Sequence, residues 1–367
     1  MKNKRKLLRR SLLALAAAGL LALVVAYSLK GAFRMQPFTS PTQSFIETHM
    51  KNANGTIATY LREAKPQEAD IVAGREALSE SLGFWMVYAA QRGDRPRFEQ
   101  AVSALKRFFL APENYLYWKL DEDGTASVTT EALGDDLRVI GALLEAADRW
   151  EEPEYSRLAA SLSETLNRSV RSGEYFVDFH DFANGRSASV FSLAYDDIGA
   201  LRRMNAAGLI DGDMLERHAA LLRDMPVDGV FYPKSYAVST GGFVYDDTVN
   251  LIDQLLVGLH GAEAGRKPSE LTEFLRREFA QRGRLPGRYD RESRKPAADY
   301  ESPSVYGLAI LLALEEGDRE WAAALAKRML ALRGEDGAYS GGYVFDGDTH
   351  VFDNLLPLLA EDRLHDR

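Results

Sequence analysis

Glu80 is the first residue of this chain whose type and position could do chemistry. It stands near the start of a helical pattern, between Ser79 and Ser81, and an apolar run that includes Trp85 follows it. A carboxyl beside such side chains is partly desolvated, so its pKa rises and it can act as a proton donor. The competing interpretation is an ordinary acidic residue in a first helical turn, where it favours the positive end of the helix dipole.

Four aspartates further along the chain occupy similar positions. Asp135 and Asp136 stand at the start of one apolar helical pattern. Asp246 and Asp247 stand at the start of another. Aspartates are good N-caps, because their carboxylates accept hydrogen bonds from the free N–H groups of the first helical turn. The cap interpretation and a chemical role are therefore both open for these residues.

The second pair of aspartates belongs to a segment that the chain repeats. Residues 241–256 read GGFVYDDTVNLIDQLL, and residues 341–356 read GGYVFDGDTHVFDNLL. The copies share two glycines, a valine, two leucines and two aspartate positions, Asp246/Asp346 and Asp253/Asp353. A segment used twice in one chain is interpreted as structural, here a Gly-Gly hairpin that leads into a capped helix.

The repeat distinguishes the two aspartates that precede its helix. Asp246 is kept in the second copy as Asp346, so we interpret it as the cap common to both copies. Asp247 is replaced by Gly347, and residues peculiar to one copy are the better candidates for chemistry. Asp247 is therefore slightly favoured over Asp246 as a reactive carboxylate.

The elements that position these residues are predicted to be helices, because apolar residues recur at three- and four-residue spacings. The predicted helices lie near 41–64, 75–91, 95–110, 132–149, 153–171, 192–207, 212–223, 246–261, 268–282, 302–315, 318–333 and 347–361. Strand-like residues are sparse and predict short hairpins in loops at Tyr175–Phe179, Gly229–Phe231, Phe243–Tyr245 and Tyr343–Phe345. About twelve paired helices without heptads or a fixed repeat period indicate an all-α fold, an (α/α)6 barrel of six helical hairpins.

The N-terminus carries the pattern of a membrane anchor. Residues 1–10 hold six Lys or Arg and no acidic residue, and the 19 residues of Ser11–Leu29 carry no charge. That length can span a bilayer, and the basic flank predicts a cytoplasmic N-terminus. We expect a cytoplasmic stub and an uncleaved signal-anchor helix over 1–34, followed by an extracellular domain over 35–367. Secretion after cleavage of the signal is the alternative.

Composition excludes several classes of function. The net charge is −9 although residues 1–34 are basic, so nucleic acid is not an expected ligand, whereas a neutral or cationic polymer is. No cysteine occurs, which excludes disulfides, thiol chemistry and a lipid-bearing cysteine. The six histidines show no ligand spacing, and no phosphate-binding glycine loop or nucleophile elbow is present. We expect no metal and no cofactor.

Three motifs, in order and at helix starts, resemble those of glycoside hydrolase family 8. The run Ser79-Glu80-(x)2-Gly83-Phe84 resembles its Ser-Glu-Gly motif, with Ser81 where the family has glycine. The segment 134–150, with Gly-Asp-Asp, an Ala-Leu-Leu-x-Ala helix and a final Trp, is similar to its second signature. The Tyr-Asp pair before the helix of 241–256 is similar to its third, in which the family Arg would fall on Asn250.

The resemblance implies an (α/α)6 barrel and the roles of particular residues. Glu80 would be the general acid, and Asp247 or Asp246 the general base. The family aspartate that holds the sugar would fall on Gly134, so Asp135 or Asp136 would take its place. Aromatic residues would supply stacking surface for sugar rings: Tyr115, Trp118, Tyr195 and Tyr245.

The resulting hypothesis is an endo-acting, inverting hydrolase of a β-linked polysaccharide. The anchor makes the chain resemble the membrane-associated members that degrade cell-surface exopolysaccharide in biofilms. We expect a monomer that meets its polysaccharide outside the membrane, beside the exopolysaccharide synthesis machinery. Two alternatives stay open: a non-catalytic glycan-binding protein that assists export or retention of the polymer, and a polysaccharide lyase.

Overall fold

The computed structural model of the protein describes residues 40–65, 71–335 and 337–365. From Pro41 onward they belong to one compact unit, Pro41–Arg367. The described residues contain twelve α-helices: α2 Pro41–His49, α3 Ser79–Gln91, α4 Arg95–Ala104, α5 Leu133–Trp150, α6 Pro153–Ser169, α7 Ile198–Ala206, α8 Gly212–Asp224, α9 Leu251–Glu263, α10 Ser269–Arg282, α11 Pro303–Glu315, α12 Arg319–Leu330 and α13 Phe352–His365.

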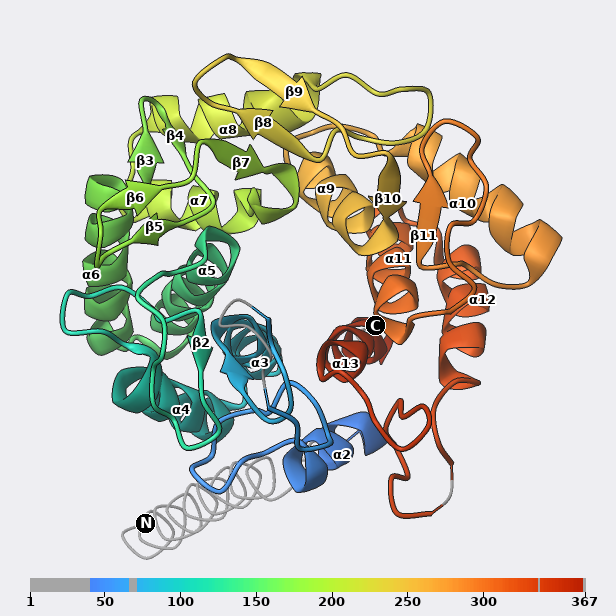
Figure 1. The fold of residues 1–367 in the computed structure, drawn as a ribbon, viewed down its shortest axis with the longest axis horizontal. Helices are drawn as coiled ribbons and strands as arrows, with labels where there is room; N and C mark the ends of the chain where they lie inside the picture. The colour runs from blue at the N-terminus through green and yellow to red at the C-terminus, as the bar shows by residue number, and fades with distance from the viewer. Residues whose placement is uncertain (1–39, 66–70, 336, 366–367) are drawn as a thin grey trace, which may run out of the picture. The chain divides into compact units, whose positions relative to one another are not determined.

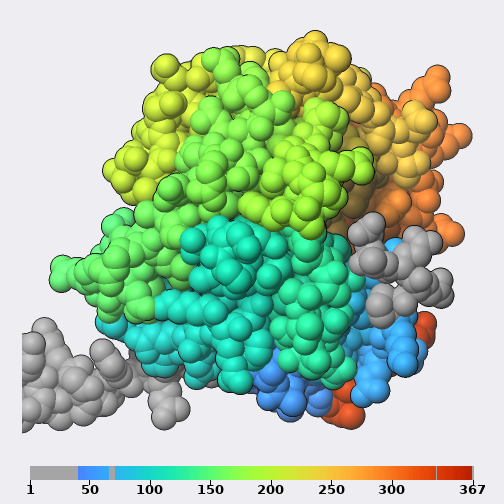
Figure 2. All heavy atoms as spheres, turned by 60° about the vertical axis from the view of Figure 1, so that its left-hand side comes forward, coloured from blue at the N-terminus to red at the C-terminus, as the bar shows by residue number. Residues whose placement is uncertain are grey.

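Within this unit the helices form a closed ring of two layers (Figure 1). The inner helices are α3, α5, α7, α9, α11 and α13; each contacts the next, and α13 closes the ring against α3. The remaining helices lie outside them. On the side shown in Figure 2, the teal and green segments of the ring form a continuous surface. The predicted (α/α)6 barrel is confirmed.

Short antiparallel strands lie in the connections between helices. They pair as β1 Ala77–Leu78 with β2 Lys119–Leu120, β3 Arg171–Ser172 with β4 Tyr175–Phe176, β5 His180–Asp181 with β6 Arg186–Ser187, and β10 Thr248–Asn250 with β11 Arg288–Asp290. A three-stranded sheet has the order β7 Val190–Ser192, β8 Ser235–Ala237, β9 Gly242–Val244. A five-residue π-helix, Leu105–Phe109, follows α4, and a 3-10 turn, η2, spans Leu193–Tyr195.

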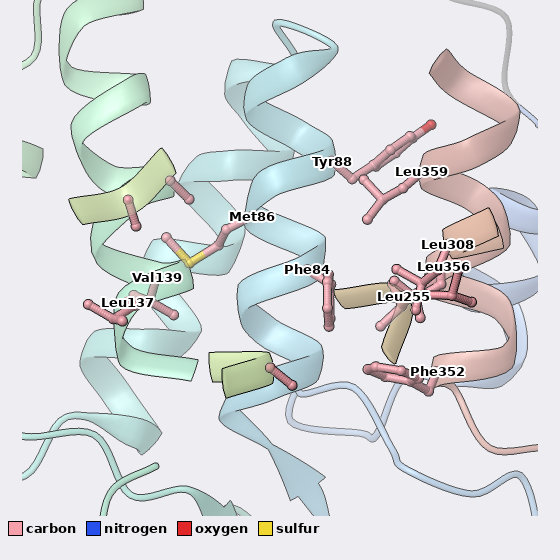
Figure 3. Packing of buried hydrophobic residues seen from close by; sticks show 14 of the residues in the cluster. Phe84, Met86, Tyr88, Leu137, Val139, Leu255, Leu308, Phe352, Leu356 and Leu359 are labelled. Atoms are coloured by element: carbon pink, nitrogen blue, oxygen red, sulfur yellow. The ribbon is translucent and has the colours of Figure 1, made fainter. Parts of the chain in front are cut away.

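Apolar side chains from the inner helices fill the middle of the ring. Figure 3 shows Phe84 of α3 facing Phe352 of α13, with Leu255, Leu308 and Leu356 close to them. The two phenyl rings meet edge to face, with centroids 5.3 Å apart. These residues come from four different helices, so the ring is a packed core rather than an open channel.

Four predictions about local structure are wrong, two of them in the second repeat copy. The predicted helix 41–64 ends at His49, because the chain then turns back on itself: Lys51 bridges to Ile57 across a turn in which the Asn54 side chain accepts the Thr56 N–H. Asp246 is not the cap of the helix in the first repeat copy. That helix, α9, begins at Leu251, and Asn250 Oδ1 accepts the Ile252 N–H at 3.1 Å.

The second copy differs before its helix, and no strand forms at Tyr343–Phe345. Asp346 and Gly347 both have positive φ, 50° and 74°, and Phe345 and Asp348 exchange two backbone hydrogen bonds across them. This is the arrangement of a two-residue type I′ turn, which favours Asp-Gly. Asp346 is therefore a turn residue and caps no helix.

No α-helix within residues 40–65, 71–335 and 337–365 is long and apolar enough to cross a membrane. The predicted anchor over 11–29 lies outside the described residues.

Candidate active site

One cavity of about 540 Å³ lies where the inner helices begin. Glu80 is the second residue of α3, Asp253 the third of α9 and Asp353 the second of α13, and all three line this cavity. Helix N-termini carry a partial positive charge, which favours carboxylates placed there. Closure of the ring thus gathers carboxylates that are far apart in the sequence.

Glu80 has the electrostatic surroundings of a proton donor. Burial raises its pKa to about 7, and the charges of Asp135 and Asp253 act in the same direction. Arg138 opposes them by lowering the pKa. A carboxyl with a pKa near neutrality holds its proton at slightly acid pH and can transfer it to a leaving group.

Asp135 lies beside Glu80 and is held by two side chains. Ser79 Oγ donates to its Oδ2 at 2.6 Å, and Arg138 Nη1 lies 3.3 Å from its Oδ1. Arg138 in turn stacks on Phe84, with its guanidinium carbon 3.9 Å from the ring centroid. Asp135 is buried and is fixed between α3 and α5, where its charge acts directly on Glu80.

The strand pair β1–β2 fixes the start of α3. The Ser79 N–H donates to the Trp118 carbonyl at 3.0 Å, which joins α3 to the chain that leads into β2. Next to it, Lys119 and Glu76 form a fully buried ion pair at 3.0 Å. Glu80 therefore projects from a backbone that is held on both sides.

Asp253 is the carboxylate that shares the cavity with Glu80 and has no fixed partner. Within the described part of the chain, no group donates a hydrogen bond to its carboxylate. Burial raises its pKa, Asp246 adds to that effect, and Lys234 and Arg288 oppose it. Because none of the described residues binds its oxygens, they are available to a water molecule or a substrate hydroxyl.

The structure places Asp246 and Asp247 outside this cavity's lining. Asp246 Oδ1 pairs with Arg291 Nη2 at 2.6 Å, and Arg291 also binds Asp228 at 2.6 Å. Asp247 is exposed, and its backbone carbonyl accepts the Arg291 N–H. Arg291 thus fastens this segment to the loop that follows β11.

Asp136 lies behind the cavity rather than in it. It is fully buried, and so is its neighbour in charge, Glu131, which accepts the His180 N–H at 2.5 Å. Burial raises the pKa of both carboxyls well above their ordinary values. The two carboxyls lie between α5 and the loop of β5, outside the lining of the Glu80 cavity.

The packing around position 134 explains why it holds glycine and not the aspartate that the family resemblance implies. A Cβ on Gly134 would lie 2.8 Å from Cδ1 of Tyr195, closer than real Cβ contacts come. The Tyr195 ring at the end of η2 therefore packs directly on α5, and it lines the same cavity as Glu80. A side chain at 134 would have to displace this ring.

The other three predicted stacking residues lie outside the cavity lining. Tyr115 is buried and stacks on Phe182, with ring centroids 3.8 Å apart. Trp118 is half-buried beside β2. Tyr245 is exposed, with the Arg291 guanidinium 5.3 Å from its ring centroid.

Several cavity residues were not predicted from the sequence. They are Tyr60, Asn250, Asp253, Arg288, Tyr300, Ser302, Ser304, His350 and Asp353. The sequence did contain a signal for some of them, because Asn250 and Asp253 occupy the positions of His350 and Asp353 in the repeat. From the sequence alone, however, the repeat favours a structural role for these positions.

Among the described residues, one group has the composition of a metal site. Ligand atoms of Asp197, His260 and Glu263 lie within 4.8 Å of one another. They line a second cavity that extends toward the C-terminal ends of the inner helices. Glu263 already accepts the Gly199 N–H at 3.1 Å, and Asp197 caps α7. The group is not part of the Glu80 cavity.

Comparison with known proteins gives one relative of high coverage. No protein-family model matches the sequence. The chain is 35% identical over 327 residues to a protein of Bacillus subtilis (strain 168) named "Putative lipoprotein YdaJ", and the match covers 88% of this chain and 86% of the relative.

Solved structures share the fold over most of its length. One described as a novel alpha-amylase from Clostridium perfringens has a TM-score of 0.78 at 23% identity, covering 89% of this chain and 98% of that one. PssZ from Listeria monocytogenes has a TM-score of 0.72 at 25% identity, covering 89% and 96%. Endoglucanase Cel10 from Klebsiella pneumoniae, a family 8 glycosyl hydrolase, has a TM-score of 0.62 at 15% identity, covering 89% and 99%.

Proposed function

Because the chain belongs to the family of YdaJ and has the fold of family-8 glycoside hydrolases, we propose that it is an endo-acting, inverting glycoside hydrolase. One observation carries the proposal. Glu80, whose pKa burial raises to about 7, lines the same cavity as the unpartnered carboxylate of Asp253. A proton donor and a proton acceptor at one cavity are the two groups that inverting hydrolysis requires.

In the proposed mechanism Glu80 protonates the glycosidic oxygen as its bond to the anomeric carbon breaks. A carboxylate on the other side of the sugar removes a proton from the attacking water, which bonds to that carbon from the opposite face. Inversion needs the two carboxyls about 6.5–9.5 Å apart, to leave room for the water. The negative charge of Asp135 raises the pKa of Glu80 and so helps to keep Glu80 protonated.

Three aspartates are candidates for the base. Asp247 and Asp246 are proposed from the sequence, and Asp253 from the structure. Asp253 is favoured because it lines the cavity with Glu80, whereas Arg291 neutralises Asp246 and Asp247 is exposed. A base must lie within reach of the water that it activates.

The proposed substrate is a β-linked polysaccharide of the cell surface. The open cavity is lined by Tyr195 and Tyr300, whose rings offer apolar faces for sugar stacking, and its carboxylates suit a neutral or cationic polymer. The predicted anchor would place the domain outside the cell, next to polymer leaving the membrane. The relative is named a lipoprotein, but this sequence has no cysteine to carry a lipid, so an apolar N-terminal segment would hold it instead.

Glu80→Gln tests the proposal. The amide keeps the size of the side chain but has no transferable proton, so turnover should fall by about 10²–10⁴-fold while the melting temperature is kept. Wild type and variant are incubated with β-glucan, xylan, chitosan, starch and native exopolysaccharide, and the products are weighed by mass spectrometry.

Hydrolysis adds the mass of one water molecule per cleaved bond. Starch is included because its linkages are α, whereas the proposed substrate is β-linked. An unsaturated product would assign a lyase, and intact polymers bound by the protein would favour the glycan-binding alternative. Near-normal activity of Glu80→Gln would contradict the acid assignment.

A further inference from the structure

His350 lies in the proposed active-site cavity without a place in the mechanism. It belongs to the second repeat copy, two residues before α13, and lines the cavity with Glu80 and Asp253. Its ring stands edge-on to that of Tyr60, with centroids 5.0 Å apart. The ring is thus held in a fixed orientation at the wall of the cavity.

A backbone hydrogen bond decides which nitrogen of His350 carries the proton. The Phe352 N–H donates to His350 Nδ1 at 3.1 Å, so Nδ1 must be unprotonated. In a neutral imidazole the other nitrogen, Nε2, then carries the hydrogen. Burial lowers the pKa of His350, although Asp353 and Asp348 partly oppose this, so the ring is neutral near pH 7. Among the described residues, no acceptor binds Nε2.

The first repeat copy contains the same device with a different residue. Asn250, at the position of His350, accepts the Ile252 N–H through Oδ1 at 3.1 Å. In both copies the side chain's acceptor atom binds the N–H two residues ahead. This leaves an N–H donor, Nε2 of His350 or Nδ2 of Asn250, and both residues line the cavity.

We propose that His350 and Asn250 are substrate-positioning residues that donate hydrogen bonds to hydroxyl oxygens of the sugar bound in this cavity. The proposal rests on the proposed hydrolase function. A sugar hydroxyl both donates and accepts, and the carboxylates of the cavity can only accept when ionised. The N–H groups of His350 and Asn250 can therefore donate to a hydroxyl oxygen, which ionised Asp253 and Asp353 cannot do.

Two variants of His350 separate the donor from the cap. His350→Asn copies the sister residue, so its Oδ1 keeps the bond to the Phe352 N–H while its amide falls short of the Nε2 position. His350→Gln reaches the Nε2 position with its amide nitrogen but gives up the cap. Asn250→Ser is the counterpart in the first copy, because serine caps a helix but has no amide donor.

The probe is the hexasaccharide that the wild type cleaves fastest among cellohexaose, xylohexaose, the glucosamine hexamer and maltohexaose. For His350→Asn and Asn250→Ser we expect KM to rise about 3- to 10-fold, the loss of one hydrogen bond, with unchanged melting temperature and a smaller change in kcat. His350→Gln should melt earlier but keep KM within about twofold of the wild type. If KM instead rises only in the variant whose melting temperature falls, both residues are merely structural and the proposal is overturned.

A second measurement does not depend on any substrate. Long-range proton–nitrogen correlation in the 15N-histidine-labelled free protein, with His350→Gln used for assignment, should show His350 neutral at pH 7 with hydrogen on Nε2. Hydrogen on Nδ1 would overturn the proposal. If the wild type cleaves none of the hexasaccharides or polymers, the hydrolase function fails, and no hexasaccharide binding to the labelled protein would overturn the donor role as well.

Discussion

The two copies of the repeat, 241–256 and 341–356, meet in one cavity but differ in what their carboxylates do. Asp253 of the first copy has no hydrogen-bond donor among the described residues. Asp353 of the second accepts from Ser302 Oγ, Ser304 N–H and Ser304 Oγ, all through Oδ1. The same sequence position is therefore free in one copy and fixed in the other, and the neighbouring helix decides which.

The segments before the two helices differ in the same way. Asp346 and Gly347 close a tight turn, whereas Asp246 is drawn into an ion pair with Arg291. A repeated sequence thus repeats the helix and the residue that caps it. The partners supplied by the rest of the ring give each copy its own chemistry.

The sharpest test of this contrast replaces each carboxylate with alanine. Asp253→Ala should lower turnover by about 10²–10⁴-fold at nearly unchanged stability, because no described partner is lost. Asp353→Ala should cost about 2–4 kcal/mol of unfolding free energy, because it leaves three donors unbound. Hydrolysis rates and urea unfolding of both variants measure the two effects.

Asp353→Asn is the control for the second copy, because its Oδ1 can still accept all three hydrogen bonds and should restore most of the stability. Azide, a small anionic nucleophile, should partly restore cleavage by Asp253→Ala. If Asp253→Ala stays active and Asp247→Asn or Asp246→Asn does not, the base belongs to the loop before α9.

The pH dependence should report Glu80 and the first copy's Asp253, and it should not depend on Asp353 of the second copy. Activity requires Glu80 protonated, so kcat/KM should fall about tenfold per pH unit above a pKa of about 7. It also requires the base ionised, and burial raises the pKa of Asp253, so the acid limb should lie above the ordinary range of an aspartate.

Lys234→Met removes a cation that lowers the pKa of Asp253, so the acid limb should move to higher pH. Asp353→Asn should leave both limbs in place. Equal shifts in the two variants would mean that the carboxylates act as one group.

The smallest expected difference concerns the residues before the helices. Asp246→Asn should cost about 1–2 kcal/mol of unfolding free energy, because it removes the charge that Arg291 binds in a partly buried position. Asp346→Asn should change it by less than about 0.5 kcal/mol, because asparagine also tolerates positive φ in a turn. Urea unfolding distinguishes the two, and equal costs would contradict the different roles assigned here.

Much of the fold could be predicted from the sequence, because helix periodicity is a local property and the inner helices carry it strongly. Glu80 was also accessible, since its motif and the apolar residues after it are contiguous. The role of Asp253 could not be predicted. It is a candidate base because no described residue binds its carboxylate, and its neighbours are known only once the ring of helices has closed. Its conservation in the second copy as Asp353 even argued for a structural role.

Gly134 shows the same limit from the other side. The sequence shows a missing aspartate, but not that the ring of Tyr195, sixty-one residues later, fills the space of its Cβ. Asp135, one position on, is the residue that faces Glu80. A shift of one residue around a helix start can be resolved only when the packing of its neighbours is known.

The closure of α13 on α3 has a consequence for how the protein is made. The cavity is lined by Glu80, from the first inner helix in the sequence, and by His350 and Asp353, from the start of the last one. A fragment that lacks either helix therefore lacks part of the site. Contacts between segments so far apart in sequence form late, since a long loop must close first. If the domain is exported, as proposed, it acquires its cavity only after its last helix has emerged.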